Sequence, residues 1–316
     1  MKRISLDQVI SLFPQGKFVG NPSAHIDGVI GIGEAQGIEA AAKASWVNDK
    51  NAPGIAPVSL HLGLLILSPK AYEYLKTSLA NFLIVDNPRA VFFQMVNELF
   101  RPERKTGIET TAVVHHSATI GNNVYIGHHV VVEENCIIGD NTSILHHTVL
   151  LAGTQVGNDC IIGCHNTIGN YGFGYEKDEA GDYEVLQHLG RVIIHDRVEI
   201  HNNTCIDRGV LTDTVIHENV KIDNLVHIAH GVVIERNSLI IANALIGGST
   251  RIGENSWIAP SVSVINKVTV GKNTMTGIGA VIVKNTEENL TYIGNPAIRM
   301  DEYKKWSEVR KKLLGS

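Results

Sequence analysis

The sequence predicts a mainly β protein: a parallel β-helix of hexapeptide repeats, with a small α/β domain before it and a helix after it. Two observations support this. Aliphatic residues recur at every sixth position between residues 114 and 270, and glycine often follows them, as in IGNNVY, IGHHVV and IGENSW. A period of six fits neither an amphipathic helix nor an alternating strand. It fits a coil in which each hexapeptide is one short strand and one turn.

The repeat runs in three registers. Aliphatic residues fill about one position in four of an average chain, so runs of this length are not chance. Three hexapeptides make one triangular coil, in which the aliphatic residue fills the interior and Gly, Asn or Asp turns the corner. The predicted interior positions are Val114, Ile120, Ile126, Val132, Ile138, Ile144, Leu150, Val156, Ile162, Ile168; Ile194, Ile200, Ile206; and Ile216, Ile222, Ile228, Ile234, Ile240, Ile246, Ile252, Ile258, Val264, Val270.

The segments outside the repeat differ in pattern. Residues 1–105 alternate helix-like SLDQVISLF, strand-like GLLILS and NFLIVD, and helix-like PRAVFFQMVNELF, which predicts a small α/β domain. The β-helix is expected over 106–293, and a turn and amphipathic helix over 294–316. Residues 169–190 interrupt the repeat as a long loop, and their glycines and aromatics favour a functional role over packing.

The composition indicates a folded soluble protein, with 44% hydrophobic and 19% charged residues among 316. A net charge of -5 gives no reason to expect nucleic acid. The four cysteines have no zinc spacing, so we expect reduced, mostly buried thiols. Without a signal-like apolar region or a run approaching the roughly 20 residues of a membrane span, a cytoplasmic location is expected.

Five of the 15 histidines form a ladder. His129, His147 and His165 are spaced by 18 residues, and His128 and His146 repeat the spacing beside them. Stacked imidazoles can converge on zinc. In the hexapeptide-repeat carbonic anhydrases the third ligand would fall on position 170, which here is asparagine. The ladder is therefore interpreted as a row of turn residues, exposed or at a subunit contact, and no metal is expected.

Another histidine occupies a different kind of position. The segments IDRG, IAHG and IGGS fall at the same place on three successive coils, which puts His230 at a corner between Arg208 below and Gly248 above. A corner side chain points outward, where a neighbouring subunit could close a cleft. His227 precedes the interior Ile228, so strand alternation points it outward on a flat face, where a structural role is favoured.

This corner suggests acyl-transfer chemistry. A neutral His230 could take a proton from an amine or hydroxyl that attacks an acyl group, and the backbone N–H of Gly248 could donate to the oxyanion. Asp223 is a candidate to orient the imidazole, although a solvated turn aspartate fits equally. The sequence has no serine or cysteine nucleophile motif, so direct transfer is favoured over a covalent acyl-enzyme.

Several longer segments carry a resemblance: GFGY, LGRVII, TCIDRGVLTDTVI, KIDNLVHIAHGVVI and YIGNPA, preceded by GVIGIGEAQ, ASWVNDKN and FLIVDNPRAVFFQMV. Through these the sequence resembles the UDP-3-O-acylglucosamine N-acyltransferases of bacterial lipid A biosynthesis over nearly its whole length. The resemblance implies a left-handed β-helix and a homotrimer with three active sites between subunits. It also implies transfer of a 3-hydroxyacyl chain from acyl carrier protein to the 2-amine of a UDP-3-O-acylglucosamine, without a cofactor.

The resemblance places the catalytic base on His230, the oxyanion glycine on Gly248, and a uracil-stacking aromatic on Trp46 in the N-terminal domain. Some positions depart from the family. Asp49 and Ala52 replace the asparagine and tyrosine that contact uridine, Lys267 replaces a second histidine, and His188 replaces a glutamine. The C-terminal helix, where carrier protein docks, is short. The candidate substrate-binding residues are Trp46, Asp49, Phe173, His188, Arg208 and Lys267.

Two alternatives remain open. The runner-up is an N-acyltransferase for another nucleotide-linked aminosugar of O-antigen or surface glycan, with acyl-CoA or acyl carrier protein as donor. The GNPA segment supports it, because such a tail resembles acetyl-CoA-dependent sugar acetyltransferases. A third class is a non-catalytic or metal-binding β-helix built around the histidine ladder.

Overall fold

The computed structural model describes residues 3–35, 38–56 and 60–314, and the chain divides into two compact units, Met1–Arg104 and Lys105–Ser316. The first unit is an α/β domain around a five-stranded sheet in the order β2-β7-β6-β5-β4. Strand β2 runs antiparallel to β7 and the other pairs are parallel. The strands are β2 (Lys17–Val19), β7 (Leu79–Ile84), β6 (His61–Leu67), β5 (Lys43–Trp46) and β4 (Gly28–Val29); β1 (Ile4–Ser5) pairs with β3 (His25–Ile26).

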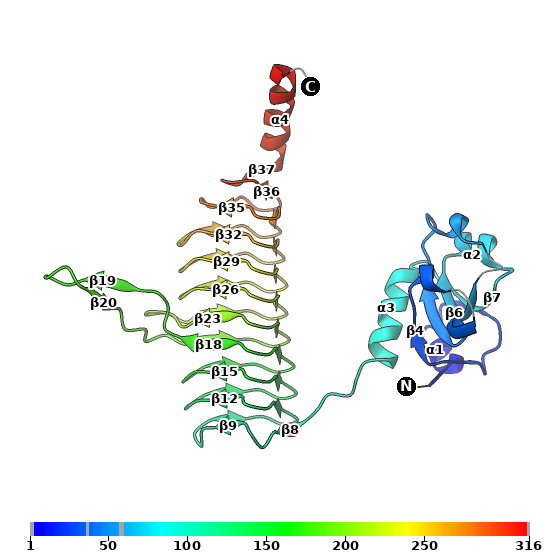
Figure 1. Ribbon diagram of the computed structural model, residues 1–316, viewed down its shortest axis with the longest axis horizontal. Helices are drawn as coiled ribbons and strands as arrows, with labels where there is room; N and C mark the ends of the chain where they lie inside the picture. Colours follow the sequence, from blue (N-terminus) through cyan, green and yellow to red (C-terminus); the bar gives the residue numbers. More distant parts are fainter. Residues whose placement is uncertain (1–2, 36–37, 57–59, 315–316) are drawn as a thin grey trace. The chain divides into compact units, whose positions relative to one another are not determined.

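Local sequence signals explain the helices of this unit (Figure 1). A capping box between Ser5 and Gln8 starts α1 (Leu6–Leu12), and the Ser68 side chain caps α2 (Pro69–Leu75). Asn87 caps α3 (Pro88–Leu99), which opens on the predicted Pro88. Short 3-10 turns lie at Ile32–Glu34, Ile38–Ala40 and Ala52–Gly54.

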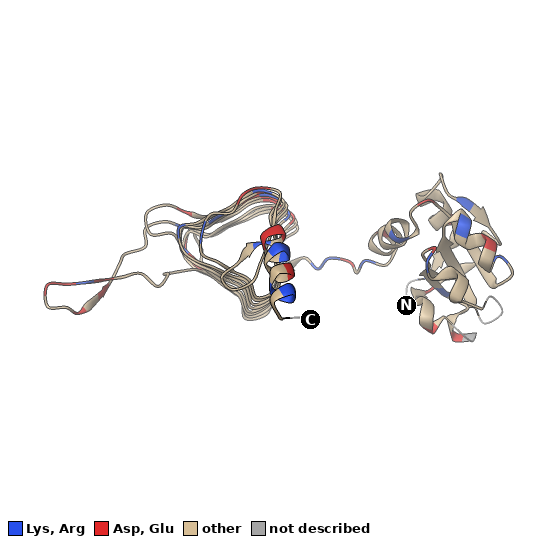
Figure 2. Ribbon diagram, turned by 90° about the horizontal axis from the view of Figure 1, so that it is seen from above, with Lys and Arg blue, Asp and Glu red and all other residues tan. Residues whose placement is uncertain are grey.

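The second unit is the predicted left-handed parallel β-helix (Figure 1). Seen along its axis, the coils superpose into a triangle (Figure 2). The chain visits three faces in turn. Face one contains β8 (Gly107–Ile108), β11 (Tyr125–Ile126), β14 (Ser143–Ile144), β17 (Ile161–Ile162), β22 (Glu199–Ile200), β25 (Lys221–Ile222), β28 (Leu239–Ile240), β31 (Trp257–Ile258), β34 (Met275–Thr276), β36 (Thr291–Ile293) and β37 (Ile298–Arg299).

The other two faces have the same construction. Face two contains β9 (Val113–Val114), β12 (Val131–Val132), β15 (Val149–Leu150), β18 (Thr167–Asn170), β23 (Cys205–Asp207), β26 (His227–Ile228), β29 (Leu245–Ile246), β32 (Ser263–Val264) and β35 (Val281–Ile282). Face three contains β10 (Thr119–Ile120), β13 (Ile137–Ile138), β16 (Gln155–Val156), β21 (Val192–Ile194), β24 (Thr214–Ile216), β27 (Val233–Ile234), β30 (Arg251–Ile252) and β33 (Thr269–Val270).

The interior confirms the six-residue register. Every predicted interior aliphatic is buried except Val114 and Ile120, which are half-buried in the first coil. The corners demand left-handed backbone: residues such as Asn123, Asn141 and Asn237 have φ near 55–60°. Asparagine tolerates this region better than most residues, which is why the turns are rich in it.

The interrupting segment is more ordered than the predicted loop. Strand β19 (Tyr175–Lys177) pairs antiparallel with β20 (Tyr183–Val185), and this hairpin projects away from the stack (Figures 1 and 2). At the other end, α4 (Met300–Leu314) extends from the last coil, and none of its described side chains is buried. The described helices are all too short or too polar to cross a membrane. Of the cysteines, Cys136 and Cys160 are buried, whereas Cys164 is half-buried and Cys205 exposed, so the expectation of mostly buried thiols is wrong for these two.

Candidate active site

His230 lies at the corner where the chain turns from face two to face three, directly after β26. The repeat is broken along this two–three corner, because the segment 171–190 leaves the stack after β18 and rejoins it at β21, two coils below His230. The backbone holds the corner from above, since Ser249 N–H donates to the His230 carbonyl at 2.8 Å. Sequence counting identified the coil position of this histidine and placed Gly248 next to it on the coil above.

One side chain and two glycines lie against the His230 side chain. The His188 ring meets it edge-to-face, with centroids 5.7 Å apart. A Cβ built on Gly172 would lie 3.0 Å from the Cβ and Cδ2 of His230, and one built on Gly248 only 2.6 Å from Nε2. Burial lowers the pKa of His230, with smaller contributions from His188 and Lys267. A lowered pKa keeps the imidazole neutral at physiological pH, as a general base requires.

Gly248 combines a close approach with a free donor. Its carbonyl accepts from Lys267 N–H at 2.9 Å, whereas its own N–H donates to no group among residues 3–35, 38–56 and 60–314. A backbone N–H without a partner beside the imidazole can donate to an oxyanion that forms next to His230. A side chain at this position would occupy the same space.

The structure gives two of the predicted site residues other partners. Arg208 donates from Nε to the Gly169 carbonyl at 2.6 Å and from a terminal nitrogen to the Ala152 carbonyl at 2.5 Å. It thereby fixes the point where the loop departs. Asp223 lies at the corner between faces one and two, where its carboxylate accepts from Asn224 N–H and Ala242 N–H. Its carboxylate also faces His201, at 3.5 Å between Oδ1 and Nδ1, and contacts no atom of His230 in the described part of the chain, so an orienting role within one chain has no geometric support.

A buried carboxyl near the site was missed by the sequence reasoning. Asp207, one residue before Arg208, is 8% exposed, and burial raises its pKa to about 7. Its carboxylate faces the titratable ring of His227, at 3.6 Å between Oδ2 and Nε2, and burial lowers the pKa of that histidine. His227 is half-buried on face two rather than simply solvent-facing. The only sequence signal was an acidic residue directly after an interior isoleucine.

The remaining candidates of the second unit are peripheral. Phe173 is 90% exposed, and Lys267 is an exposed corner residue with φ of 63°. Both lie near the two–three corner: Phe173 follows Gly172, and Lys267 is one coil above Gly248.

The first unit has a separate pocket of about 330 Å³ around Trp46. Phe92 and the amides Asn48 and Asn51 also line it, so an aromatic platform with amide groups is present. Asp49, the predicted contact, instead accepts a hydrogen bond from Ser68 Oγ. Asn48 and Asn51, which the sequence reasoning missed, are visible in the segment NDKN, where they flank Asp49 and Lys50.

The histidine ladder is the predicted row of turn residues. His129, His147 and His165 stack face to face with centroids 4.7–4.9 Å apart, and each has φ near 60°. His128 and His146 stack beside them at 5.5 Å. Parallel stacked rings do not converge on one point, and the described residues contain no cluster of three His, Cys, Asp or Glu able to hold a metal.

These features define a hexapeptide-repeat β-helix with a histidine-centred corner site. Family models agree: residues 213–248 match "Bacterial transferase hexapeptide (six repeats)", and residues 104–173 match "GMPPB C-terminal domain".

The chain is similar to proteins named UDP-3-O-acylglucosamine N-acyltransferase. It is 33% identical to that of Wolinella succinogenes over 51% of this chain and 49% of the relative. It is 36% identical to that of Coxiella burnetii over 54% and 55%, and 34% identical to that of Acinetobacter baylyi over 64% and 60%. The chain thus spans about half of the curated relatives it matches.

Solved structures show the same fold. The UDP-N-acetylglucosamine acyltransferase of Bacteroides fragilis superposes with a TM-score of 0.56 at 24% identity, covering 61% of this chain and 73% of that one. The Arabidopsis enzyme of the same name gives a TM-score of 0.51 at 22% identity, with the same coverage.

Proposed function

We propose that this protein is an N-acyltransferase that moves a 3-hydroxyacyl chain from acyl carrier protein to the 2-amine of a UDP-3-O-acylglucosamine. The observation that supports it most is the pairing of a neutral His230 with the partnerless N–H of Gly248 at the broken corner. The names of the relatives agree with this proposal.

The chemistry follows from the geometry. His230 accepts a proton from the sugar amine as the amine nitrogen attacks the thioester carbonyl. Gly248 N–H donates to the carbonyl oxygen as negative charge develops on it, and one such donor is typically worth about 3 kcal/mol of barrier. The proton then passes from His230 to the leaving thiolate. A homotrimer would close each corner with a neighbouring subunit, and Trp46 with Asn48 and Asn51 would hold the uracil in the first unit.

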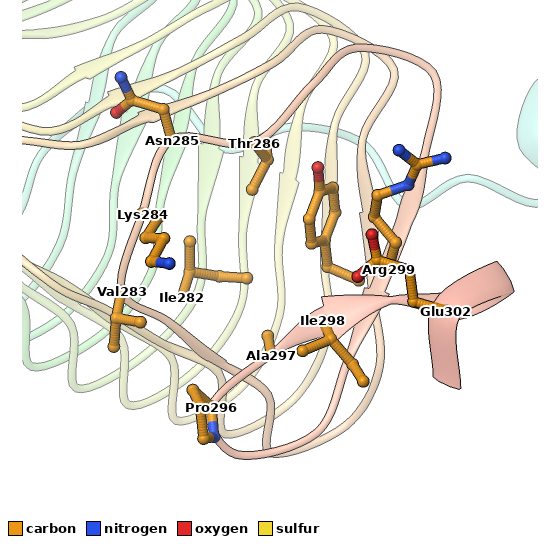
Figure 3. A pocket seen from close by; sticks show the side chains of 11 residues that line it. Ile282, Val283, Lys284, Asn285, Thr286, Pro296, Ala297, Ile298, Arg299 and Glu302 are labelled. Atoms are coloured by element: carbon orange, nitrogen blue, oxygen red, sulfur yellow. The ribbon is translucent and has the colours of Figure 1, made fainter. Parts of the chain in front are cut away.

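A second candidate for the acyl donor is acyl-CoA. A cavity of about 230 Å³ lies between the last coil and the start of α4, beside the GNPA turn (Figure 3). Lys284 lines one side and Arg299 the other, where Arg299 is already paired with Glu287 and Asp301. A lysine can meet a phosphate as a point charge, so Lys284 at a cavity beside this turn favours an acyl-CoA donor, as in the second candidate function.

A donor panel decides between the two. Wild type and His230→Ala would be given 3-hydroxyacyl carrier protein or acetyl-CoA, with UDP-3-O-acylglucosamine as acceptor. The leading proposal expects amide formation with the carrier-protein thioester alone, abolished in the variant. Transfer from acetyl-CoA alone would assign the acyl-CoA donor of the second candidate, and transfer from neither would remove the leading proposal.

A further inference from the structure

One buried polar atom at the corner has no partner. His188 is 2% exposed, and its Nδ1 lies 2.6 Å from the Leu186 carbonyl oxygen. A carbonyl only accepts, so Nδ1 carries a hydrogen and donates it. In the neutral ring Nε2 then presents a lone pair, and no group in the described part of the chain donates to it. Buried polar atoms in native proteins are normally hydrogen-bonded, so an unpaired His188 Nε2 indicates that a ligand donates a hydrogen bond to it.

The lone pair faces the space beside the proposed base. Gly172 lies over it, because a Cβ on that glycine would lie 3.1 Å from His188 Nε2 and 3.0 Å from the His230 side chain, and a Cβ on Gly174 would lie 3.6 Å from the same Nε2. Gly172 belongs to an exposed segment, with Phe173 90% and Tyr171 48% exposed. A small displacement of residues 171–174 therefore opens Nε2 to the same space that His230 faces.

We propose that His188 and His230 form a pair of hydrogen-bond acceptors that selects an amine over a hydroxyl as the attacking group. This inference rests on the proposed function. An amine nitrogen attacks with its lone pair and still has two N–H donors, one for each imidazole. Two hydrogen bonds of about 2.9 Å from one tetrahedral nitrogen place their acceptors about 4.7 Å apart. Ring centroids 5.7 Å apart allow that separation.

The bonds and protons balance for the amine. The C–N bond forms and the C–S bond breaks, and the proton taken by His230 goes to the thiolate. The second N–H remains in the product amide and stays bonded to His188 Nε2. A hydroxyl has one hydrogen, which must go to His230, so its attack would leave Nε2 buried without a donor. A site with an unmet buried polar group rejects the isostere that lacks the donor.

Two substitutions of His188 separate this role from a structural one. His188→Asn places an amide nitrogen where Nδ1 lies, so it keeps the Leu186 bond and loses the Nε2 acceptor. His188→Gln places an amide oxygen near Nε2 and gives up the Leu186 bond. Each variant would be assayed with UDP-3-O-acylglucosamine and with its glucose analogue, which carries a 2-hydroxyl in place of the amine, using saturating 3-hydroxyacyl carrier protein.

We expect His188→Asn to lower kcat/KM for the amine by about 10- to 100-fold while changing the value for the hydroxyl by less than about 3-fold. His188→Gln should retain most of the preference for the amine. A structural role predicts the reverse order, with the asparagine variant the more active and both acceptors affected alike. That result, or an unchanged amine-to-hydroxyl ratio in the asparagine variant, overturns the inference while the proposed function stands.

Thermal melting of both variants checks that the fold is retained. If wild type acylates neither acceptor, the proposed function itself fails, and the selection role falls with it.

Discussion

Two corners of the same β-helix carry histidine rings in contact with one another, and they differ in ring geometry, burial and neighbours. At the corner between faces one and two, His129, His147 and His165 repeat coil after coil, solvent-facing and parallel. At the two–three corner, His230 meets His188 edge-to-face, where a long segment has been inserted and glycines line the ring. The stacked ladder follows the hexapeptide repeat, whereas the His188–His230 contact involves a segment that interrupts the repeat.

The difference has a physical cause. A perfect repeat gives each corner residue the same neighbours above and below, so identical side chains stack and face water. Chemistry needs unlike groups converging on one point, which a repeat supplies only where it is broken. Insertion of residues 171–190 buries His188, and the glycines at 172 and 248 leave room beside His230.

The largest expected effect is that of His230→Ala. Removal of a general base should lower kcat for acyl transfer about 10²- to 10⁴-fold. His147→Asn is the matched control, because asparagine keeps the left-handed backbone of that corner. We expect the control to keep activity within about 2-fold and stability within about 0.5 kcal/mol. Equal losses of activity in both variants would show that the two corners do not differ in their contribution to catalysis.

Next in size is Gly248→Ala. Its Cβ would lie 2.6 Å from His230 Nε2 and must displace the ring from the oxyanion donor. We expect kcat to fall about 10²- to 10³-fold, measured by steady-state kinetics. Gly33→Ala, where a Cβ meets nothing within 4 Å, serves as the control. A variant that changed only KM would show that Gly248 does not act in the transition state.

The buried Asp207 affects stability rather than rate. Its folded pKa, about 7, lies above the ordinary aspartate value of 3.8, so the folded state holds more protons between these pH values. Stability from this group is therefore highest at low pH and declines as pH rises through about 7. Asp207→Asn should gain on the order of 2 kcal/mol at pH 8 and little at pH 4. Urea unfolding at both pH values measures this, and an equal change at both would contradict it.

The smallest effect concerns Lys267, whose charge contributes to the lowered pKa of His230. Lys267→Ala should move the acid limb of kcat/KM toward higher pH, by less than about half a unit, since burial remains the main cause. High salt should produce a similar shift in wild type by screening the charge. A shift toward lower pH would show that the lysine does not act on His230 by its charge.

The β-helix was predictable because one packing rule, repeated at every sixth residue, determines burial from Ile126 to Val270. The coil position of His230 followed from the same count. The contact between His230 and His188 did not follow from it, because residue 188 belongs to a non-repeating segment. A periodic pattern cannot predict the path of such a segment. Arg208 was placed by the repeat register and Asp223 by its position just upstream of His230, yet each hydrogen-bonds to backbone groups of its own coil stack.

The pH dependence of acyl transfer tests the central claim most directly. If His230 is the base, wild-type kcat/KM should decline with falling pH along a limb whose apparent pKa lies below the ordinary histidine value of 6.5, because the neutral imidazole is the active form. In His230→Ala the residual activity should lose that limb. An acid limb of unchanged position in the variant would show that another group accepts the proton.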